Sequence, residues 1–348
     1  MSSDSQPVVS VLMPTYKRPK LLRRAIRGVL NQTYPHLKLC IFDDASGDET
    51  SKVVNEFSKD DSRLIYHCND KNIGAVLNCA QALENARTQY FTFCADDDVL
   101  LPQHIELAME GFKKYPEAGF VSNQIICMDE QRRILHISHL DSPAGLYNSA
   151  EGIKLLLKDP GIITGVVVRK EVLQSGVSLD LDVGMLWDWD FCFQALAKFP
   201  LVVTEKQGCI FVTHSASSFV ALLGKYEWPG WLKMYQKIVD HPNLGLDTKR
   251  DVEFHLKKRL RSLLVKQGKE AILSENYSLA DLSAQTMKDF FDSPRHYYKL
   301  KILAFICKLF PPYRWFLIFT RKVRSKKKVF KGSVRYQKYQ GFEKYLDI

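Results

Sequence analysis

Four short apolar runs, separated by segments with helical periodicity, dominate the first hundred residues. The apolar runs span residues 8–13, 37–42, 64–67 and 90–94. The segments between them, residues 21–30, 51–57 and 75–86, repeat apolar side chains at helical spacing, with Arg23, Arg24 and Arg27 on the polar face of the first. Strands that alternate with helices imply right-handed crossovers and a mostly parallel, twisted sheet flanked by helices. The sequence therefore predicts an α/β fold.

The regular alternation ends near residue 100, and the chain is too long for a single core. We expect further strands at 118–123 and 165–169, a helix at 188–198, and edge strands at 201–204 and 209–212. From about residue 231 the pattern is helical. The predicted organisation is a catalytic domain over residues 1–230, a helical extension over 231–294 and a basic amphipathic tail over 295–348.

Polar side chains follow each of the four predicted strands. They occupy residues 14–18, 43–48, 69–72 and 96–98. In an open α/β sheet, ligands bind outside the carboxyl ends of the strands. The consecutive carboxylates of Asp96, Asp97 and Asp98 repel one another unless a cation or hydrogen bonds compensate. An oxygen-only cluster of this kind suits Mg²⁺ or Mn²⁺, shared with substrate phosphates.

Each polar segment also has a purely structural interpretation. The acids at 96–98 are suited to capping a following helix. Asp43 and Asp44, with Ser46 and Gly47, are typical of a turn. Pro14-Thr15 is suited to ending a strand and capping the next helix. Their joint position at successive strand ends favours a binding site over these explanations.

The order of these motifs resembles the family 2 glycosyltransferases, which have the GT-A fold. The resemblance rests on segments 10–16, 31–35, 42–50, 72–78 and 96–102, and it covers roughly residues 8–220. It implies an inverting enzyme that moves a sugar from a nucleotide diphosphate donor to an acceptor hydroxyl. The family's processive members carry a QxxRW segment and transmembrane helices, and neither is evident here, so we expect transfer of a single sugar.

The resemblance also assigns roles to particular residues. It implies that Thr15, Tyr16 and Asp44 hold the nucleoside of the donor, that Arg18 helps with ribose or phosphate, and that Asp96 lies near the ribose. Pro14 and Asn72 complete this predicted nucleotide-sugar site.

The metal-binding end of the family's DxD-type motif matches Asp97 and Asp98, which would hold Mn²⁺ or Mg²⁺. Ala95 stands where many members carry another Asp, so it stays open which two of the three acids contact the metal. His214 resembles a late histidine of the family that completes the metal shell, and it is the third predicted ligand.

The catalytic base is expected in the segment Trp187-Asp188-Trp189-Asp190. This segment resembles the family's ED-type motif, and Asp188 matches the base, with Asp190 as the alternative. A carboxylate beside the acceptor hydroxyl removes its proton as the oxygen attacks the anomeric carbon, which contributes about 10²–10⁴-fold in rate. The structural alternative is that Asp188 caps a helix and the two tryptophans are core residues.

The formal charge of +10 is concentrated near the C-terminus. Residues 295–335 hold 13 Lys or Arg and no acid, and without them 36 basic residues stand against 39 acidic ones. Aromatic and aliphatic residues are mixed with these charges, which suits a segment lying on the surface of an anionic membrane. We therefore expect peripheral binding to the cytoplasmic face of the inner membrane. The alternative is a helical lid packed on the catalytic domain.

Cysteine usage and the N-terminus favour a cytoplasmic protein. Eight cysteines are scattered singly without CxxC spacing, which argues against a disulfide framework or a zinc site. Residues 1–6 are polar and do not form a secretory signal.

The expected partners are a nucleotide-sugar donor, with a UDP-sugar favoured, and a glycan or lipid-linked glycan acceptor used in polysaccharide, lipopolysaccharide or other glycoconjugate assembly. Two other classes of function compete with this one. A nucleotidyltransferase that makes nucleotide sugars needs a glycine-rich loop after the first strand, and residues 14–19 contain no glycine. A non-catalytic protein that binds nucleic acid or membrane through the basic tail leaves the acidic strand ends unexplained. We therefore expect no nucleic-acid partner.

Overall fold

The computed structural model describes residues 6–158, 163–213, 228–321, 336 and 339–347. The chain divides into two compact units. The first comprises Met1–Val212, His241–Leu244 and Lys338–Ile348, and the second comprises Thr213–Asp240 and Gly245–Gln337. The first unit therefore ends earlier than the expected boundary at residue 230, and it includes the last residues of the chain.

The first unit is built from one sheet and the helices around it. Its strands are β1 (Val9–Thr15), β2 (Leu37–Asp43), β3 (Leu64–Cys68), β4 (Tyr90–Phe93), β5 (Val99–Leu100), β6 (Phe120–Asp129), β7 (Ile134–Ile137), β8 (Gly145–Tyr147), β9 (Val166–Arg169) and β10 (Leu201–Thr213). Its helices are α1 (Pro19–Leu30), α2 (Thr50–Ser58), α3 (Ala75–Glu84), α4 (His104–Lys114), α5 (Ser149–Lys158), α6 (Glu171–Gln174) and α7 (Trp187–Leu196), with short 3₁₀ turns at Ile163–Gly165, Leu181–Leu186 and Phe342–Leu346.

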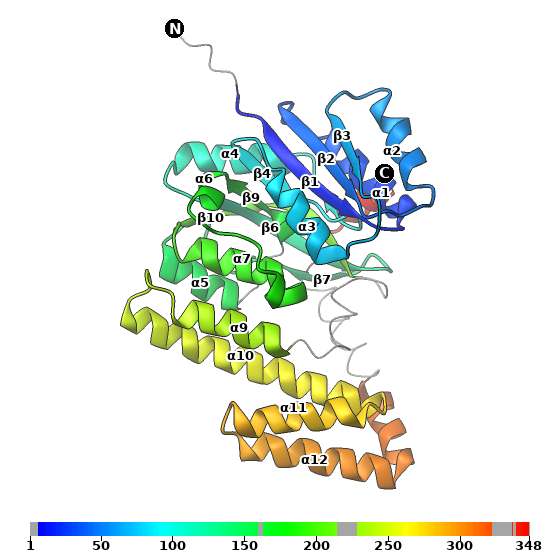
Figure 1. Cartoon of the computed structure of the whole chain (residues 1–348), viewed down its shortest axis with the longest axis vertical. Coiled ribbons are helices and arrows are strands. Elements are labelled where there is room, and N and C mark those ends of the chain that lie inside the picture. Colours follow the sequence, from blue (N-terminus) through cyan, green and yellow to red (C-terminus); the bar gives the residue numbers. More distant parts are fainter. Residues whose placement is uncertain (1–5, 159–162, 214–227, 322–335, 337–338, 348) are drawn as a thin grey trace. The chain divides into compact units, whose positions relative to one another are not determined.

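The strand order is β3-β2-β1-β4-β9-β6-β10-β5, with β7 beside β6 and β8 beside β10 (Figure 1). The four strands that the sequence predicts most clearly, β1 to β4, are parallel to their neighbours. The pairings of β9 with β4 and β6, of β7 with β6, and of β10 with β5 and β8 are antiparallel. The prediction of an α/β sheet flanked by helices, with a helical region toward the C-terminus, is confirmed, and the complete sheet is mixed.

Side chains of β1 alternate between two helical layers. Val9, Val11 and Met13 belong to a core cluster shared with α1, α2 and α4. On the other face, α3 packs against β1 and β2, and Trp187 at the start of α7 contacts Phe93 of β4 at 5.2 Å between ring centroids. The start of α3 lies at the carboxyl edge of the parallel strands, because the amides of Ile73 and Gly74 donate to Asp44, which follows β2.

Two strand predictions differ from the structure. The expected edge strands 201–204 and 209–212 form a single strand, β10, which lies inside the sheet between β6 and β5 and also pairs with β8. The first strand continues through Pro14 to Thr15. Pairing with β4 has already ended at Leu12↔Phe93, so the missing amide hydrogen of Pro14 costs no bond on that side.

The second unit is helical. It contains α9 (Trp228–Val239), α10 (Leu246–Leu273), α11 (Tyr277–Asp289), α12 (Pro294–Leu309) and a further helix, Pro311–Arg321. α11 and α12 pack beside one another and against α10 (Figure 1). The beginning of the predicted tail is thus part of this helical unit.

No single helix in the described ranges is long and apolar enough to cross a membrane. The pair Pro294–Leu309 and Pro311–Arg321 meets the criteria of length and composition only when its two helices are taken together, and they are bent by 116° at the break.

Candidate functional site at the carboxyl edge of the parallel strands

The carboxyl ends of the parallel strands bring the predicted polar residues to one edge of the sheet. The hydroxyl of Thr15, at the end of β1, donates to Asp96 Oδ2 at 2.8 Å, just beyond β4. The amide of Asn69, just beyond β3, donates to Asp44 Oδ1 at 3.1 Å. Residues from four separate strand ends are therefore linked by hydrogen bonds.

Arg18 provides a counter-charge to the acidic cluster. Its Nη1 atom lies 3.1 Å from Asp96 Oδ1 and 2.8 Å from Asp97 Oδ2, and both carboxylates are almost fully buried. Burial, and then the charge of Asp97, raise the pKa of Asp96 to about 6 despite this arginine. Arg18 therefore offsets only part of the cost of burying these neighbouring carboxylates.

Asp98 is used differently from its two neighbours. It is completely buried, and its oxygens accept hydrogen bonds from the Thr164 hydroxyl at 2.7 Å and from the Val212 amide at 3.2 Å. Burial and the charge of Asp97 raise its pKa well above the ordinary value. That Asp98 binds a metal ion stays a prediction, and each of its two oxygens already accepts one of these hydrogen bonds.

The acids at 96–98 do not cap a helix. The next helix, α4, begins at His104, and its N-cap residue is Gln103. The structural explanation offered by the sequence is therefore wrong for this segment.

Asp44 organises the loop that leads into α3. Its carboxylate accepts hydrogen bonds from the backbone amides of Ile73 and Gly74, both at 2.8 Å, and the side chain of Asn72 donates to its carbonyl oxygen at 3.2 Å. Gly74 precedes α3 with φ of 91°, a conformation that glycine adopts without strain. Binding of the donor's nucleobase by Asp44 stays a prediction. Any such contact would be made in addition to these hydrogen bonds.

The neighbouring Asp43 forms the turn that the sequence also suggested. Its Oδ1 atom accepts hydrogen bonds from the amide of Ser46 at 3.0 Å and from the hydroxyl of Ser46 at 2.5 Å, and its Oδ2 atom accepts one from Tyr66 at 2.6 Å. The turn interpretation thus holds for Asp43, while Asp44 faces α3.

The loop after β1 presents an accessible aromatic ring. Tyr16 is 41% exposed, whereas Thr15 beside it is buried and Pro14 is partly buried. Lys17 has a positive φ of 53°, and its amide donates to the Ser46 hydroxyl at 2.8 Å, which ties this loop to the one after β2. The arrangement leaves the Tyr16 ring available to stack on a planar ligand.

The predicted base, Asp188, lies in the first turn of α7 and is partly exposed. Its Oδ1 atom accepts a hydrogen bond from the amide of the next residue, Trp189, at 2.8 Å. The N-cap residue of α7 is Leu186, so the interpretation of Asp188 as a helix cap is wrong. Burial raises the pKa of Asp188 to about 6. Asp190, the alternative, is completely buried and accepts a bond from Gln194 at 2.6 Å. Its burial makes it a poorer partner for an acceptor hydroxyl.

One buried thiol reports how close these acids are. Burial, and then the negative charges of Asp188, Asp96 and Asp44, raise the pKa of Cys79, on α3, to about 12. These three carboxylates therefore lie in the neighbourhood of one side chain.

Three residues at the edge were given no role in the site by the sequence analysis. Arg24 lies on α1, where helical spacing put it on the polar face, yet its Nη2 atom donates to the carbonyl oxygen of Asp97 at 2.5 Å. Its Nε atom is buried without a hydrogen-bond partner in the described part of the chain. Thr164 fixes Asp98, and Asn78 donates to the carbonyl oxygen of Phe42 at 2.8 Å. The sequence indicated Arg24 only as a cation in the first two turns of α1.

The donor set fits a divalent cation that is shared with a ligand. Carboxylate oxygens are the preferred ligands of Mg²⁺ and Mn²⁺, and Asp96 and Asp97 lie close enough together for one guanidinium nitrogen of Arg18 to contact both. Within the described ranges, no group of three or more His, Cys, Asp or Glu residues is arranged to hold a metal ion. His214 lies outside the described residues. One or two carboxylates together with substrate phosphates satisfy Mg²⁺ without such a group.

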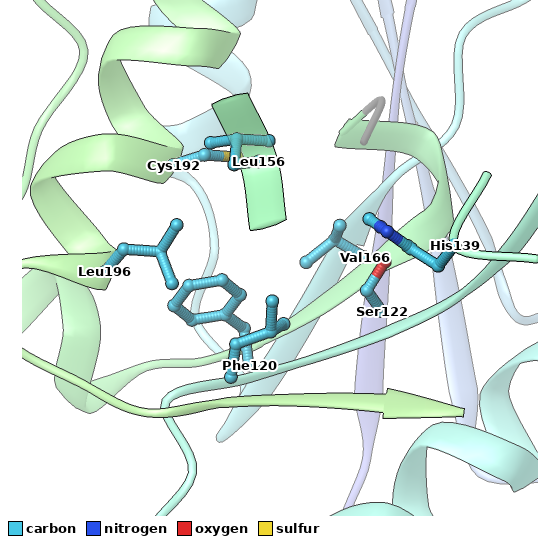
Figure 2. A pocket seen from close by; sticks show the side chains of 8 residues that line it. Phe120, Ser122, His139, Leu156, Val166, Cys192 and Leu196 are labelled. Carbon is cyan, nitrogen blue, oxygen red and sulfur yellow. The ribbon is translucent and has the colours of Figure 1, made fainter. Parts of the chain in front are cut away.

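A small internal cavity lies behind α7 and is separate from this edge. Its volume is about 20 Å³, and Cys192 and Leu196 of α7 line it together with Phe120 and Val166 (Figure 2). A space of this size holds about one water molecule. It is too small for a sugar.

Comparison with known proteins agrees with this arrangement. The model of the family described as glycosyl transferase family 2 matches residues 10–175. This segment contains every strand end described above. Residues 10–175 are a family 2 glycosyltransferase domain.

The glycosyltransferase domain is similar to a GalNAc(5)-diNAcBac-PP-undecaprenol beta-1,3-glucosyltransferase from Campylobacter jejuni. The two are 36% identical over 105 residues, which are 30% of this chain and 34% of that protein. The match thus spans about a third of the relative's length.

Two solved structures are similar in fold. One is Staphylococcus aureus TarS 1–349 in complex with UDP-GlcNAc, with a TM-score of 0.63 and 13% identity, covering 84% of this chain and 90% of that one. The other is the mannosyltransferase PcManGT from Pyrobaculum calidifontis in complex with GDP-Man and Mn²⁺, with a TM-score of 0.56 and 16% identity, covering 88% of each chain. At these identities the likeness shows the GT-A fold.

Proposed function

We propose that this protein is an inverting, metal-dependent glycosyltransferase that moves a single sugar from a nucleotide diphosphate donor to an acceptor hydroxyl. The observation that carries the proposal is that hydrogen bonds join the polar residues after the four parallel strands, Thr15 to Asp96 and Asn69 to Asp44, while Arg18 pairs with Asp96 and Asp97. An acidic cluster at this edge of a GT-A sheet supports a site for a nucleotide diphosphate and its cation.

The donor is bound by the loops after β1, β2 and β3. The exposed ring of Tyr16 stacks on the base, and Thr15 and Asp96, already joined by a hydrogen bond, face the ribose. Pro14 and Asn72 shape the two loops, and Asp44 accepts from the base. A UDP-sugar is the favoured donor, and the similar structures contain UDP-GlcNAc or GDP-Man.

Asp97, with Asp96 or Asp98 and with His214, would hold Mn²⁺ or Mg²⁺. The presence of Mn²⁺ in the PcManGT complex supports this assignment. The ion supplies positive charge against the diphosphate that leaves. Arg18, now between Asp96 and Asp97, lies at the right place to contact the same phosphates.

Asp188 is the general base. Its partly exposed carboxylate takes the proton of the acceptor hydroxyl while that oxygen attacks the anomeric carbon from the side opposite the diphosphate. The sugar is transferred in one displacement, so its anomeric configuration inverts. Burial keeps the pKa of Asp188 at about 6, which leaves the carboxylate mostly deprotonated near pH 7 and still basic enough to take the proton.

The acceptor is a glycan or a lipid-linked glycan in the assembly of a surface polysaccharide or another glycoconjugate. The name of the Campylobacter relative, which includes a polyprenol-linked acceptor, supports this part of the proposal. An enzyme with such an acceptor works at the cytoplasmic face of the inner membrane.

A thermal-shift screen of UDP-, GDP- and dTDP-sugars tests the donor site. The full chain is melted with each donor, with and without Mn²⁺, and donors that stabilise it are then assayed for transfer. A ligand at 100 times its Kd stabilises the folded state by about 2.7 kcal/mol, which is easily detected. If no nucleotide sugar raises the melting temperature with or without Mn²⁺, the proposal is wrong.

A further inference from the structure

The helix α12 has two apolar faces, of which the unit covers only one. Leu300 and Cys307 are buried, and together with Leu303 and Ala304 they pack against apolar side chains of α10 and α11. This face holds the helix in place. When the opposite side of a helix is apolar as well, that second surface needs a partner that shields it from water.

The second face is a stripe of exposed large side chains at positions i, i+4, i+7, i+8 and i+11. They are Tyr298, Ile302, Phe305, Ile306 and Leu309, each between 38% and 68% exposed. The stripe continues beyond the break with Phe310 and with Trp315, Phe316 and Phe319 of the next helix. Nine of the 19 exposed large apolar side chains in the described part of the chain thus fall within residues 298–319. A concentration of this kind marks an interaction surface.

A cluster of cations lies beside this stripe. Arg261 and Lys269 on α10 and Arg295 and Lys299 on α12 all lower the pKa of His296, after burial, which shows that their charges gather around one side chain. Within the described residues none of the four forms an ion pair, unlike Lys301, which pairs with Asp281. The sequence contains no acid between residues 293 and 342. The cluster therefore complements an anionic partner.

We propose that the exposed stripe of α12 and of helix Pro311–Arg321 docks on a membrane rich in anionic lipid. The apolar side chains enter the boundary between headgroups and acyl chains, and the four clustered cations contact headgroup phosphates. The 116° bend between the two helices suits segments that lie along a surface. This inference assigns a defined surface to the membrane location that was proposed in the previous section. Vesicle binding tests it without any measurement of sugar transfer.

Flotation of the full chain with phosphatidylcholine vesicles, with and without phosphatidylglycerol, measures the binding. We expect binding to the anionic vesicles. The double variant Phe305→Ser, Leu309→Ser weakens it by at least ~10-fold, because two large side chains no longer leave water. The double variant Arg295→Gln, Lys299→Gln weakens it by about fivefold for each charge removed.

Matched controls come from the same unit. Phe254 is 62% exposed on α10, and the side chain of Arg250 is 80% exposed, yet neither lies in the stripe or the cluster. Phe254→Ser and Arg250→Gln should bind vesicles as the wild type does. Asp188→Asn should also bind fully, which separates failure of this inference from failure of the proposed reaction.

Three results would overturn the inference. The first is flotation that does not change in the Phe305→Ser, Leu309→Ser variant. The second is equal binding to neutral and anionic vesicles. The third is salt-dependent binding to a DNA duplex without binding to either vesicle, which would assign the cations to nucleic acid.

Discussion

Replacement of Asp188 by Asn tests the assignment of the catalytic base. The change keeps the size of the side chain and the acceptor for the Trp189 amide, but it removes the group that takes the proton. We expect kcat to fall by about 10²–10⁴-fold while KM for the donor stays nearly constant, because the donor loops do not involve this residue.

The wild-type pH profile gives an independent measure of the same carboxyl. Because burial raises the pKa of Asp188 to about 6, the carboxylate is mostly deprotonated at pH 7 and mostly protonated at pH 5. The base acts only when deprotonated, so kcat/KM should fall by about tenfold from pH 7 to pH 5. Initial rates at acceptor concentrations well below KM, measured across this range, show the acid limb.

Asp190→Asn is the matched control for this experiment. Asp190 is completely buried and bonded to Gln194, so the variant should lower the melting temperature yet keep the acid limb near pH 6. An Asp188→Asn enzyme with wild-type kcat would refute the assignment. Loss of the acid limb in Asp190→Asn alone would make Asp190 the base.

Three further substitutions test the donor loops and the acidic cluster. Tyr16→Ala should raise KM for the donor about tenfold and leave the melting temperature unchanged, because the exposed ring contributes stacking alone; an unchanged KM in donor saturation curves would remove the ring from the site. Asp98→Ala should destabilise the protein by about 2–4 kcal/mol in urea denaturation, since two hydrogen bonds lose their acceptor. Asp98→Asn should keep most of the stability, and an equal loss in both variants would contradict this account. Gly74→Ala should cost about 1–2 kcal/mol in the same assay because φ is 91°, and a neutral result would show that the loop adapts.

The parallel half of the fold was predictable because its signals are local. The apolar runs of β1 to β4 and the helical spacing of α1 lie within single elements, and each matches the structure to within a few residues. The antiparallel half depends on contacts between distant segments. β10 was predicted as two edge strands since nothing within residues 201–213 indicates that β5, β6 and β8 pair with it.

The candidate site divides in the same way. Asp44, Asp96 and Asp97 were identified by their position after strands, because the carboxyl ends of parallel strands must share one edge. Helical spacing alone could not show that Arg24 turns toward Asp97, since residues at the border between the two faces of a helix turn either way. The sequence likewise could not show that Asp98 differs from Asp96 and Asp97. The hydrogen-bond donors to its two oxygens, Thr164 and Val212, are 66 and 114 residues away along the chain.

The position of Arg18 has a consequence for how ligands enter. In the protein alone, its guanidinium group already acts as the counterion of Asp96 and Asp97. A metal ion that binds Asp97 must displace this side chain, and a diphosphate offers the displaced cation a new partner. Metal and donor should therefore each strengthen the binding of the other, and together they should raise the melting temperature by more than the sum of their separate effects. Arg18 would then make occupancy by either ligand alone a minor state of the enzyme.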